Sequence, residues 1–378
     1  MSTLKVDAIR HNSATSDAIT TAADGTCTAR ITGMTGGGGL SHRNLVINGA
    51  MTVAQRSVSS TSSGFHTVDR FEVEYTGTDE APTQAQVDVS AGTTPYTNGF
   101  RKAFKITNGN QTSGAGSSDR IRYRYKVESQ DLANSGWNYV SSSSNVTLSF
   151  WIKSSVAQNF YGQFLTMDGT QRAYTFETGS LTADTWTKIT KTITGDSNIT
   201  FNNDNGLGLQ FDFFAFLGTA STGTMTLNQW GNYNGSARTP DNTTTWYTTN
   251  DATLEITGVQ LEVGDTATSF EHRSAAEELE LCKRYYQQVF FYWNTGSTNS
   301  NYLYYVGGQF HPVMRAAPSL VAGYDNNNEN SFETRDGSTW RTGLPSLISA
   351  HTEGVVLRSN NNVVFNAIKG IAHFAAEL

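Results

Sequence analysis

Hydrophobic and polar residues alternate along most of the chain between residues 44 and 270. The clearest run covers residues 121–127, where Ile, Tyr, Tyr and Val alternate with Arg, Arg and Lys. Residues 71–75 and 207–213 show the same period of two. Because successive side chains of a strand point to opposite faces, this period predicts strands with one face on a core and the other in solvent.

Turn signals separate these predicted strands, which supports a mainly β fold. They are the dipeptides Asn98-Gly99, Asn108-Gly109, Asp168-Gly169 and Asn234-Gly235. The chain has 35 Gly against 6 Pro and only 16% charged residues, a composition that suits short strands joined by tight polar turns. We therefore expect an antiparallel β-sandwich of the jelly-roll kind.

One segment, residues 274–286, follows a helical period instead. Ser274 and Glu277 have the spacing of a capping box, and Lys283 and Arg284 lie in the last turn, where cations complement the helix dipole. The apolar face consists of Ala275, Leu279, Cys282 and Tyr286. At 1.5 Å per residue the helix spans roughly 20 Å. We interpret the stretch 258–286 as a last sandwich strand followed by a connector helix, with no ligand contact.

These patterns divide the chain into four parts. Residues 1–40 form an N-terminal segment with a Gly-rich linker, and residues 41–271 form the jelly roll. Residues 272–288 are the connector helix, and residues 289–378 are a small C-terminal β domain with the distal position. The first segment is too short to bury a core alone, so it needs a partner. Its apolar residues, predicted to dock on that partner, are Leu4, Val6, Ile9 and Ile19.

Several motifs occur in a fixed order. They are residues 44–49 (NLVING), Gln55-Arg56, Asp69-Arg70-Phe71, 148–153 (LSFWIK), 256–264 (ITGVQLEVG), 267–271 (ATSFE), 281–286 (LCKRYY) and 310–318 (FHPVMRAAP). This ordered set resembles the tail-fibre and tail-tip receptor-binding proteins of tailed phages that carry a carbohydrate-binding-module-like jelly roll. The chain departs from that pattern at Phe71, where the family usually has Trp.

The resemblance implies a structural component of a phage virion, a tail fibre that attaches to a host-surface glycan without catalysis. The implied partners are two further copies in a homotrimer, a phage tail or adaptor protein at the N-terminus, and the glycan. The implied location is the virion, assembled in the host cytoplasm and released by lysis. The first alternative is a purely structural capsid decoration or fibre adaptor. A polysaccharide-degrading tailspike ranks below it.

Net charge and cysteine content exclude other classes. With 26 basic and 33 acidic residues the net charge is −7, which disfavours nucleic-acid binding through phosphates. No apolar run approaches the length of a membrane span, so we expect no membrane insertion. Cys27 and Cys282 are too few for a disulfide framework, and we expect both to be reduced thiols.

Aromatic residues among amides are candidates for glycan contact, because rings stack on the apolar faces of sugars and amides bind hydroxyls. One group lies in and after a predicted loop at 228–235, although we slightly prefer the interpretation that these rings cap the core. The other group lies in a predicted loop of the distal domain, beside a Tyr that could equally face inward. The candidates are Trp230, Tyr233, Trp246, Tyr247, Asn294, Asn299, Asn301 and Tyr302.

Catalysis and metal binding have weaker signals. Hydrolysis of a glycosidic bond needs two carboxylates about 5–10 Å apart across a groove. Glu72 and Glu74 are predicted on the solvent face of one strand and point the same way, and Asp69 precedes them, so we assign no catalytic residue. Residues 334–340 resemble the Asp-box turn of sialidases, but we prefer a simple hairpin. We expect no cofactor and assign no metal ligand, although loop Asp and Asn residues leave a structural Ca²⁺ open.

A basic stripe lies on the predicted strand at 121–127. It consists of Arg120, Arg122, Arg124 and Lys126. It could attract an anionic lipopolysaccharide, or it could pair with Glu on a neighbouring strand. We prefer the pairing.

Overall fold

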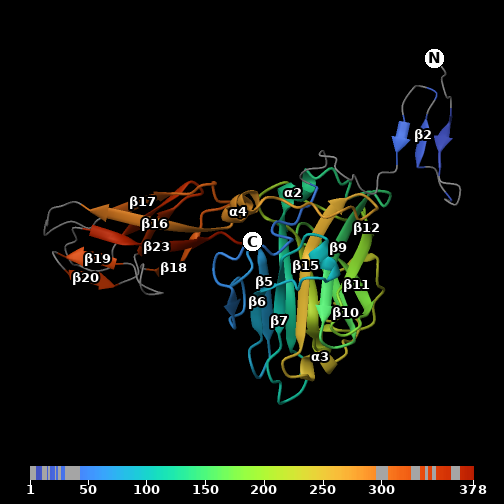
Figure 1. Cartoon of the computed structure of the whole chain (residues 1–378), viewed down its shortest axis with the longest axis horizontal. Coiled ribbons are helices and arrows are strands. Elements are labelled where there is room, and N and C mark those ends of the chain that lie inside the picture. The colour runs from blue at the N-terminus through green and yellow to red at the C-terminus, as the bar shows by residue number, and fades with distance from the viewer. Residues whose placement is uncertain are drawn as a thin grey trace.

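The computed structural model describes residues 6–10, 15, 18–21, 23, 27–29, 43–294, 305–324, 333–336, 339–342, 346–358 and 367–378. Within these ranges the chain forms a β-sandwich, a connector helix, a C-terminal β domain and a small N-terminal sheet (Figure 1). The predicted mainly β fold is confirmed.

The sandwich consists of two antiparallel sheets of six strands each. In order across it, the first sheet contains β14 (Trp230–Asn232), β11 (Arg172–Ser180), β10 (Asn159–Thr166), β13 (Leu207–Leu217), β8 (Arg120–Glu128) and β5 (Phe71–Thr76). The second contains β12 (Thr187–Thr194), β9 (Asn145–Ser154), β15 (Thr253–Val263), β7 (Lys102–Thr107), β6 (Thr83–Asp88) and β4 (Ser59–Ser60).

The core between the sheets collects one face of each alternating strand. Tyr123 and Tyr125 of β8 are buried there, and Phe213 of β13 meets Phe150 of β9 with ring centroids 5.6 Å apart. The hydroxyl of Tyr123 crosses the core and donates to the carbonyl of Phe104 at 3.0 Å. The period of two therefore identified the buried face of these strands correctly, because burial of one face is what selects that period.

The connector helix α4 (Ala275–Lys283) begins as the capping pattern predicts. The Ser274 hydroxyl accepts a hydrogen bond from the backbone N–H of Glu277 at 3.2 Å, and Cys282 is buried. The structure also contains three helices of one turn, which the sequence did not indicate because a single turn has no measurable period. They are α1 (Thr94–Thr97), α2 (Ser129–Ala133) and α3 (Thr245–Thr248), with a 3-10 turn at Thr219–Ser221. Among the described helices, none is long and apolar enough to cross a membrane.

The C-terminal domain contains a five-stranded and a three-stranded antiparallel sheet. The larger sheet contains β16 (Tyr286–Asn294), β18 (Ser319–Tyr324), β19 (Glu333–Asp336), β20 (Thr339–Thr342) and β23 (Ala367–Ala375), and the smaller contains β17 (Tyr305–Gln309), β21 (Ser346–Ala350) and β22 (Gly354–Arg358). Phe310 and Phe374 pack in its core. Pairing of Asp336 with Thr339 confirms the predicted hairpin. The connector is shorter than the predicted 272–288, because the strand pairing of β16 already starts at Tyr286.

The N-terminal sheet is an antiparallel meander of β1 (Ala8–Ile9), β2 (Ile19–Thr21) and β3 (Cys27–Ala29). Val6 and Ile9 are 41% and 54% exposed. Leu4 and the Gly-rich linker lie outside the described residues. Docking of this sheet on a partner stays a prediction.

Several of the sequence motifs meet where the C-terminal domain joins the sandwich. Arg70 lies 3.4 Å from the ring centroid of Tyr285 and forms an ion pair with Glu377. Glu128 of the sandwich accepts hydrogen bonds from Arg284 at 2.9 Å and from the hydroxyl of Tyr285 at 2.6 Å. Burial acts to raise the pKa of Glu128, but these hydrogen bonds outweigh it and the pKa lies below its ordinary value. Charged contacts therefore hold the connector and the C-terminal domain against the sandwich.

Candidate functional site

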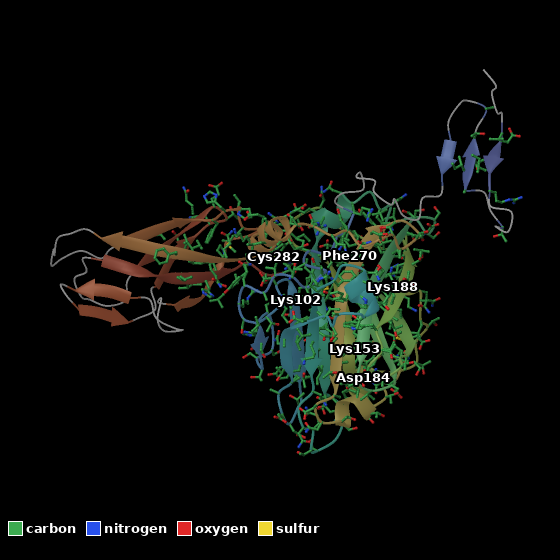
Figure 2. All side chains as sticks on the ribbon, in the orientation of Figure 1. Lys102, Lys153, Asp184, Lys188, Phe270 and Cys282 are labelled. Atoms are coloured by element: carbon green, nitrogen blue, oxygen red, sulfur yellow. The ribbon has the colours of Figure 1, made fainter. Side chains whose placement is uncertain are left out.

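The outer face of the second sheet carries an aromatic and cationic surface. On β9 the side chains of Leu148, Phe150 and Ile152 face the core, so Ser149, Trp151 and Lys153 face outward. In the register of the sheet, Trp151 stands between Lys188 of β12 and Thr257 of β15. Figure 2 locates Lys153, Lys188 and Phe270 on the sandwich.

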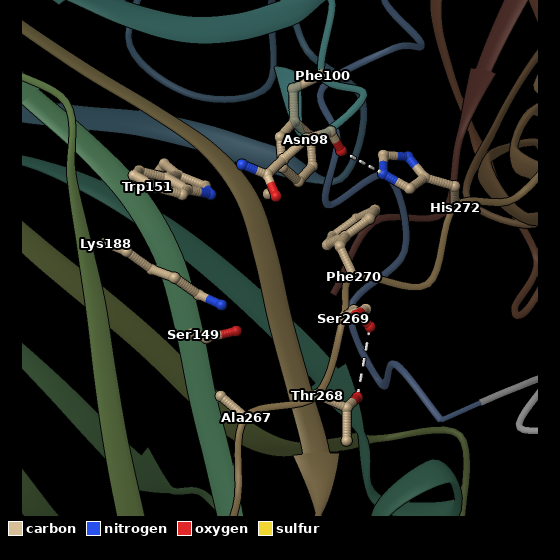
Figure 3. Close-up of a pocket in the computed structure, with 11 residues that line it drawn as sticks. Asn98, Phe100, Ser149, Trp151, Lys188, Ala267, Thr268, Ser269, Phe270 and His272 are labelled. Atoms are coloured by element: carbon tan, nitrogen blue, oxygen red, sulfur yellow. Dashed lines mark hydrogen bonds between the residues drawn. The ribbon is translucent and has the colours of Figure 1, made fainter. Parts of the chain in front are cut away.

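A pocket of about 270 Å³ lies on this face (Figure 3). Ser149, Trp151 and Lys188 contribute to it from the sheet. Asn98 and Phe100, from the turn between α1 and β7, line one side, and residues 267–270 and His272 line the other. The pocket therefore combines segments that are more than a hundred residues apart in the chain.

The segment that follows β15 forms one wall of the pocket. Two buried polar residues of β15 hold this segment in place. Glu262 is 2% exposed, and its carboxylate accepts hydrogen bonds from the backbone N–H of Thr268 at 2.8 Å and from its hydroxyl at 2.6 Å. The side-chain oxygen of Gln260, which is fully buried, accepts from the backbone N–H of Glu271 at 2.8 Å. The polar residues of the motif at 256–264 thus fold the following segment over the sheet.

The opposite wall of the pocket contains Phe100. Two glycines allow it to pack closely against β15 and His272. Gly258 has φ +64 in a β-bulge of β15, and a Cβ there would lie 2.6 Å from the ring of Phe100. Gly99 has φ +96, and a Cβ there would lie 2.9 Å from Nε2 of His272. Only glycine combines this backbone conformation with such close packing. The imidazole of His272 lies 2.9 Å from the carbonyl oxygen of Asn98, which joins the two walls.

The charges on this face are unequally compensated. Lys153 pairs with Glu255 at 3.1 Å and lies 5.2 Å from the ring centroid of Trp186. Lys188 is exposed, and among the described residues it has no hydrogen-bond or ion-pair partner for its ammonium group. No Asp or Glu occurs among the residues that line the pocket, all of which the structure describes. An aromatic ring, hydroxyls and an ammonium group can hold a polar ligand with apolar CH faces.

A second cavity, of about 400 Å³, lies between α2, the chain at Asn44–Ile47 and Arg273. Among its lining residues there is no aromatic ring. It lacks a stacking surface, and we consider the first pocket the better candidate site.

The four predicted sandwich contacts lie elsewhere. Trp246 and Tyr247 are fully buried, with the Trp246 indole N–H donating to the carbonyl of Thr253 at 3.0 Å. Burial also raises the pKa of Tyr247, whose hydroxyl donates to Asp119 at 2.9 Å. The prediction that these two rings contact a ligand is wrong, since they belong to the core.

Trp230 is only 9% exposed, and its indole N–H donates to the carbonyl of Thr194 at 2.7 Å. Trp230 therefore covers the edge of the first sheet, and most of its ring is inaccessible to a ligand. Tyr233 is half-buried beside Arg238. In the C-terminal domain, Asn294 is the last residue of β16, and no position of its side chain is described. Asn299, Asn301 and Tyr302 lie outside the described residues, so that prediction is untested.

The acidic group and the basic stripe face each other across β5 and β8. Arg124 pairs with Glu72 at 3.2 Å, as the preferred interpretation of the stripe predicts. Glu72 is 8% exposed, however, so its predicted place on a solvent face is wrong. Asp69 is buried and accepts from the backbone N–H of Gln55 at 3.0 Å. Among the described residues, no group of three or more His, Cys, Asp or Glu could hold a metal ion.

Sequence reasoning missed the pocket, although one signal was present. Residues 148–153 belong to the motifs of the sequence, and the period of two places Trp151 on the polar face with Ser149 and Lys153. A Trp on the polar face of a strand is unusual unless another segment or a ligand covers it. The stretch 258–286, for which no ligand contact is expected, contributes Gly258, Phe270 and His272 to the lining of the pocket.

Comparisons with known proteins gave matches among solved structures. No protein-family model matches the sequence, and no curated protein matches it. A structure described as "CBM4 structure and function" has a TM-score of 0.28 and 13% identity, over 57% of this chain and 98% of that one. The N-terminal cellulose-binding domain of Cellulomonas fimi β-1,4-glucanase C has a TM-score of 0.26 and 10% identity, over 57% of this chain and 99% of that one.

A third match is the family 11 carbohydrate-binding module of Clostridium thermocellum, in complex with a β-1,3-1,4-mixed-linked tetrasaccharide. Its TM-score is 0.26 with 11% identity, over 56% of this chain and 97% of that one. TM-scores of this size support no inference about the ligand of this chain, which has to come from its own residues.

Proposed function

We propose that the chain is a glycan-binding protein that uses the pocket beside Trp151. The observation that carries the proposal is a partly buried Trp on the outer face of a sheet, in one cavity with the hydroxyl of Ser149 and the ammonium group of Lys188. Sugars offer apolar CH faces to aromatic rings and hydroxyls to polar groups, so they match this combination.

We propose further that binding occurs without catalysis. The lining residues, which all belong to the described part of the chain, include no carboxylate. Glycoside hydrolysis by the common route needs an acid and a base or nucleophile of this kind on either side of the bond. This supports a binding role over that of a polysaccharide-degrading tailspike.

The sequence motifs support a place for the chain in a phage virion, as a homotrimeric tail fibre assembled in the host cytoplasm and released by lysis. The exposed Val6 and Ile9 of the N-terminal sheet fit docking to a tail or adaptor protein. Trimerisation would supply the avidity that weak sugar contacts need. Light scattering tests the trimer, and cryo-EM of whole particles tests the location; a monomer, or absence from the tail, would contradict this part.

Glycan binding is tested with the full chain on an array of bacterial surface polysaccharides. We expect W151A to weaken retention about tenfold or more, the effect of losing a central aromatic contact of about 1.4 kcal/mol. The control is F290A, which removes a 55% exposed ring of the C-terminal domain. Retention that is lost in F290A and kept in W151A would place binding in the distal domain.

A purely structural capsid decoration or fibre adaptor remains the second candidate, supported by the charged docking of the C-terminal domain on the sandwich. Adsorption of particles that carry W151A separates the two. Reduced adsorption with normal assembly supports attachment, whereas unchanged adsorption supports the structural role.

A further inference from the structure

We infer that the pocket takes a sugar unit that bears an anionic substituent, and that Lys188 and Ser149 bind the anion. This inference rests on the proposed glycan-binding function and specifies its ligand class. It starts from two donors in the pocket that the protein itself leaves unused.

The first donor is the ammonium group of Lys188. Two other lysines of this sheet have partners: Lys153 pairs with Glu255 at 3.1 Å, and Lys102 pairs with Asp88 at 2.6 Å. Lys188 alone of these three faces the pocket, and its ammonium group contacts no acceptor among the described residues. A cation at the edge of a cavity that has no lining carboxylate makes the cavity attractive for anions.

The second donor is the hydroxyl of Ser149. This residue is 4% exposed, and within the described part of the chain its side-chain oxygen has no hydrogen-bond partner. Figure 3 shows the Ser149 oxygen and the Lys188 nitrogen among the side chains that line the pocket. In the register they are diagonal neighbours on one face of the sheet, because Lys188 pairs with Trp151 and the next outward position, Thr190, pairs with Ser149. A hydroxyl and an ammonium group in one pocket match the oxygens of a carboxylate or sulfate.

The remaining lining suits the sugar ring that carries the charge. Trp151 lies next to Lys188 in the register, so a ring that stacks on the indole brings its substituent to the ammonium group. The volume of about 270 Å³ is slightly below the roughly 300–1,000 Å³ of pockets for drug-sized ligands, which fits one sugar unit. Phe100 and Phe270 also line the pocket and offer apolar contact to the sugar ring.

The experiment measures the affinity of the full chain for matched oligosaccharides that end in glucose, glucuronate or glucose 6-sulfate, at low and high salt. We expect the two charged ligands to bind at least tenfold more tightly than the neutral one, with a preference that falls as salt increases. K188Q should remove most of this preference and change the affinity for the neutral ligand less than twofold. K188R should retain it, and S149A should reduce it about threefold.

The matched control is K102Q, which removes the same charge from the same sheet outside the pocket and should keep the preference. Equal loss in K102Q and K188Q would show only a nonspecific charge effect and would overturn the inference. Equal affinity of the natural chain for neutral and charged ligands, with sensitivity to W151A, would overturn the inference and leave the proposed function intact. Absence of binding to all three ligands and to the polysaccharide array would overturn both. A preference for only one of the two charged ligands identifies the anion as carboxylate or sulfate and supports the inference.

Discussion

The two outer faces of the sandwich carry similar rows of charged residues and use them in opposite ways. On the first sheet, Asp212 is 1% exposed and forms ion pairs with Arg122 at 2.9 Å, Arg124 at 2.8 Å and Arg238 at 2.6 Å. On the second sheet, Lys188 has no such partner among the described residues and lies beside a pocket. On the first face each of these arginines has a carboxylate partner, whereas the second face leaves groups available for a ligand.

Strand order explains the difference. The basic strand β8 lies between β5 and β13, which present Glu72 and Asp212 at the positions opposite Arg124. The strand β9 lies between β12 and β15, which present Lys188 and Thr257 opposite Trp151. A charged row is therefore available to a ligand only where the neighbouring strands fail to compensate it.

The largest expected effect comes from removing the central acid of the neutralised face. D212A should lower the free energy of unfolding by about 3–5 kcal/mol, because it leaves the buried Arg238 without its carboxylate partner and removes one partner each from Arg122 and Arg124. The measurement is urea denaturation. The control is D88A, which removes an exposed partner of Lys102 and should cost at most about 1 kcal/mol. Similar losses in both variants would show that the first face is not specially dependent on its ion pairs.

A smaller effect is expected at the wall of the pocket. G258A should destabilise the chain by about 1–3 kcal/mol, because an L-residue at φ +64 is strained and its Cβ would press on Phe100. Since Phe100 lines the pocket, the retention of glycan should fall as well. G231A is the control, because no atom lies within 4 Å of a Cβ placed there and no positive φ is recorded. Unchanged stability and retention in G258A would show that the bulge does not shape the site.

The pKa of Glu72 predicts how the stability of the ion-paired face of the first sheet changes with pH. Burial raises the pKa of Glu72 above its ordinary value of 4.5, and Lys126 and Arg124 only partly oppose this. Stability from a carboxyl whose pKa is raised in the folded state is present below pH 4.5 and is lost as pH rises through the folded pKa. Gln does not ionise, so the E72Q variant does not lose this stability as the pH rises.

Unfolding experiments at pH 4 and pH 7 test the point. The stability of E72Q relative to the natural chain should increase between the two values, by less than the effect of G258A. D88N is the control, and its relative stability should not increase in this way. A relative stability of E72Q that falls as pH rises would mean that the ion pairs outweigh burial at this position.

The smallest effect is expected beside the pocket. E255Q frees Lys153 from its ion pair and should change the free energy of unfolding by less than about 1 kcal/mol. The affinity for an anionic glycan should increase slightly, by less than threefold, because a second uncompensated cation then lies on the same face. A decrease in affinity, measured by calorimetry, would count against electrostatic attraction at this face.

The sequence by itself determined the elements and their order. The period of two identified the strands and their buried faces, as at Tyr123 and Tyr125, and the capping pattern at Ser274 located the connector helix. These features are local, since a few neighbouring side chains are enough to specify a strand face or a helix start.

Only the tertiary structure decided which residues remain available to a ligand. It buried Trp246 and Tyr247, which sequence reasoning offered as contacts, and it placed Trp151 at a pocket, although Trp151 was not among the predicted contacts. It also neutralised the arginine stripe with Glu72 and Asp212, and left Lys188 uncompensated in the described part of the chain. The physical reason is that availability depends on the register between strands and on the segments that fold over them, and contacts between distant residues have no local period.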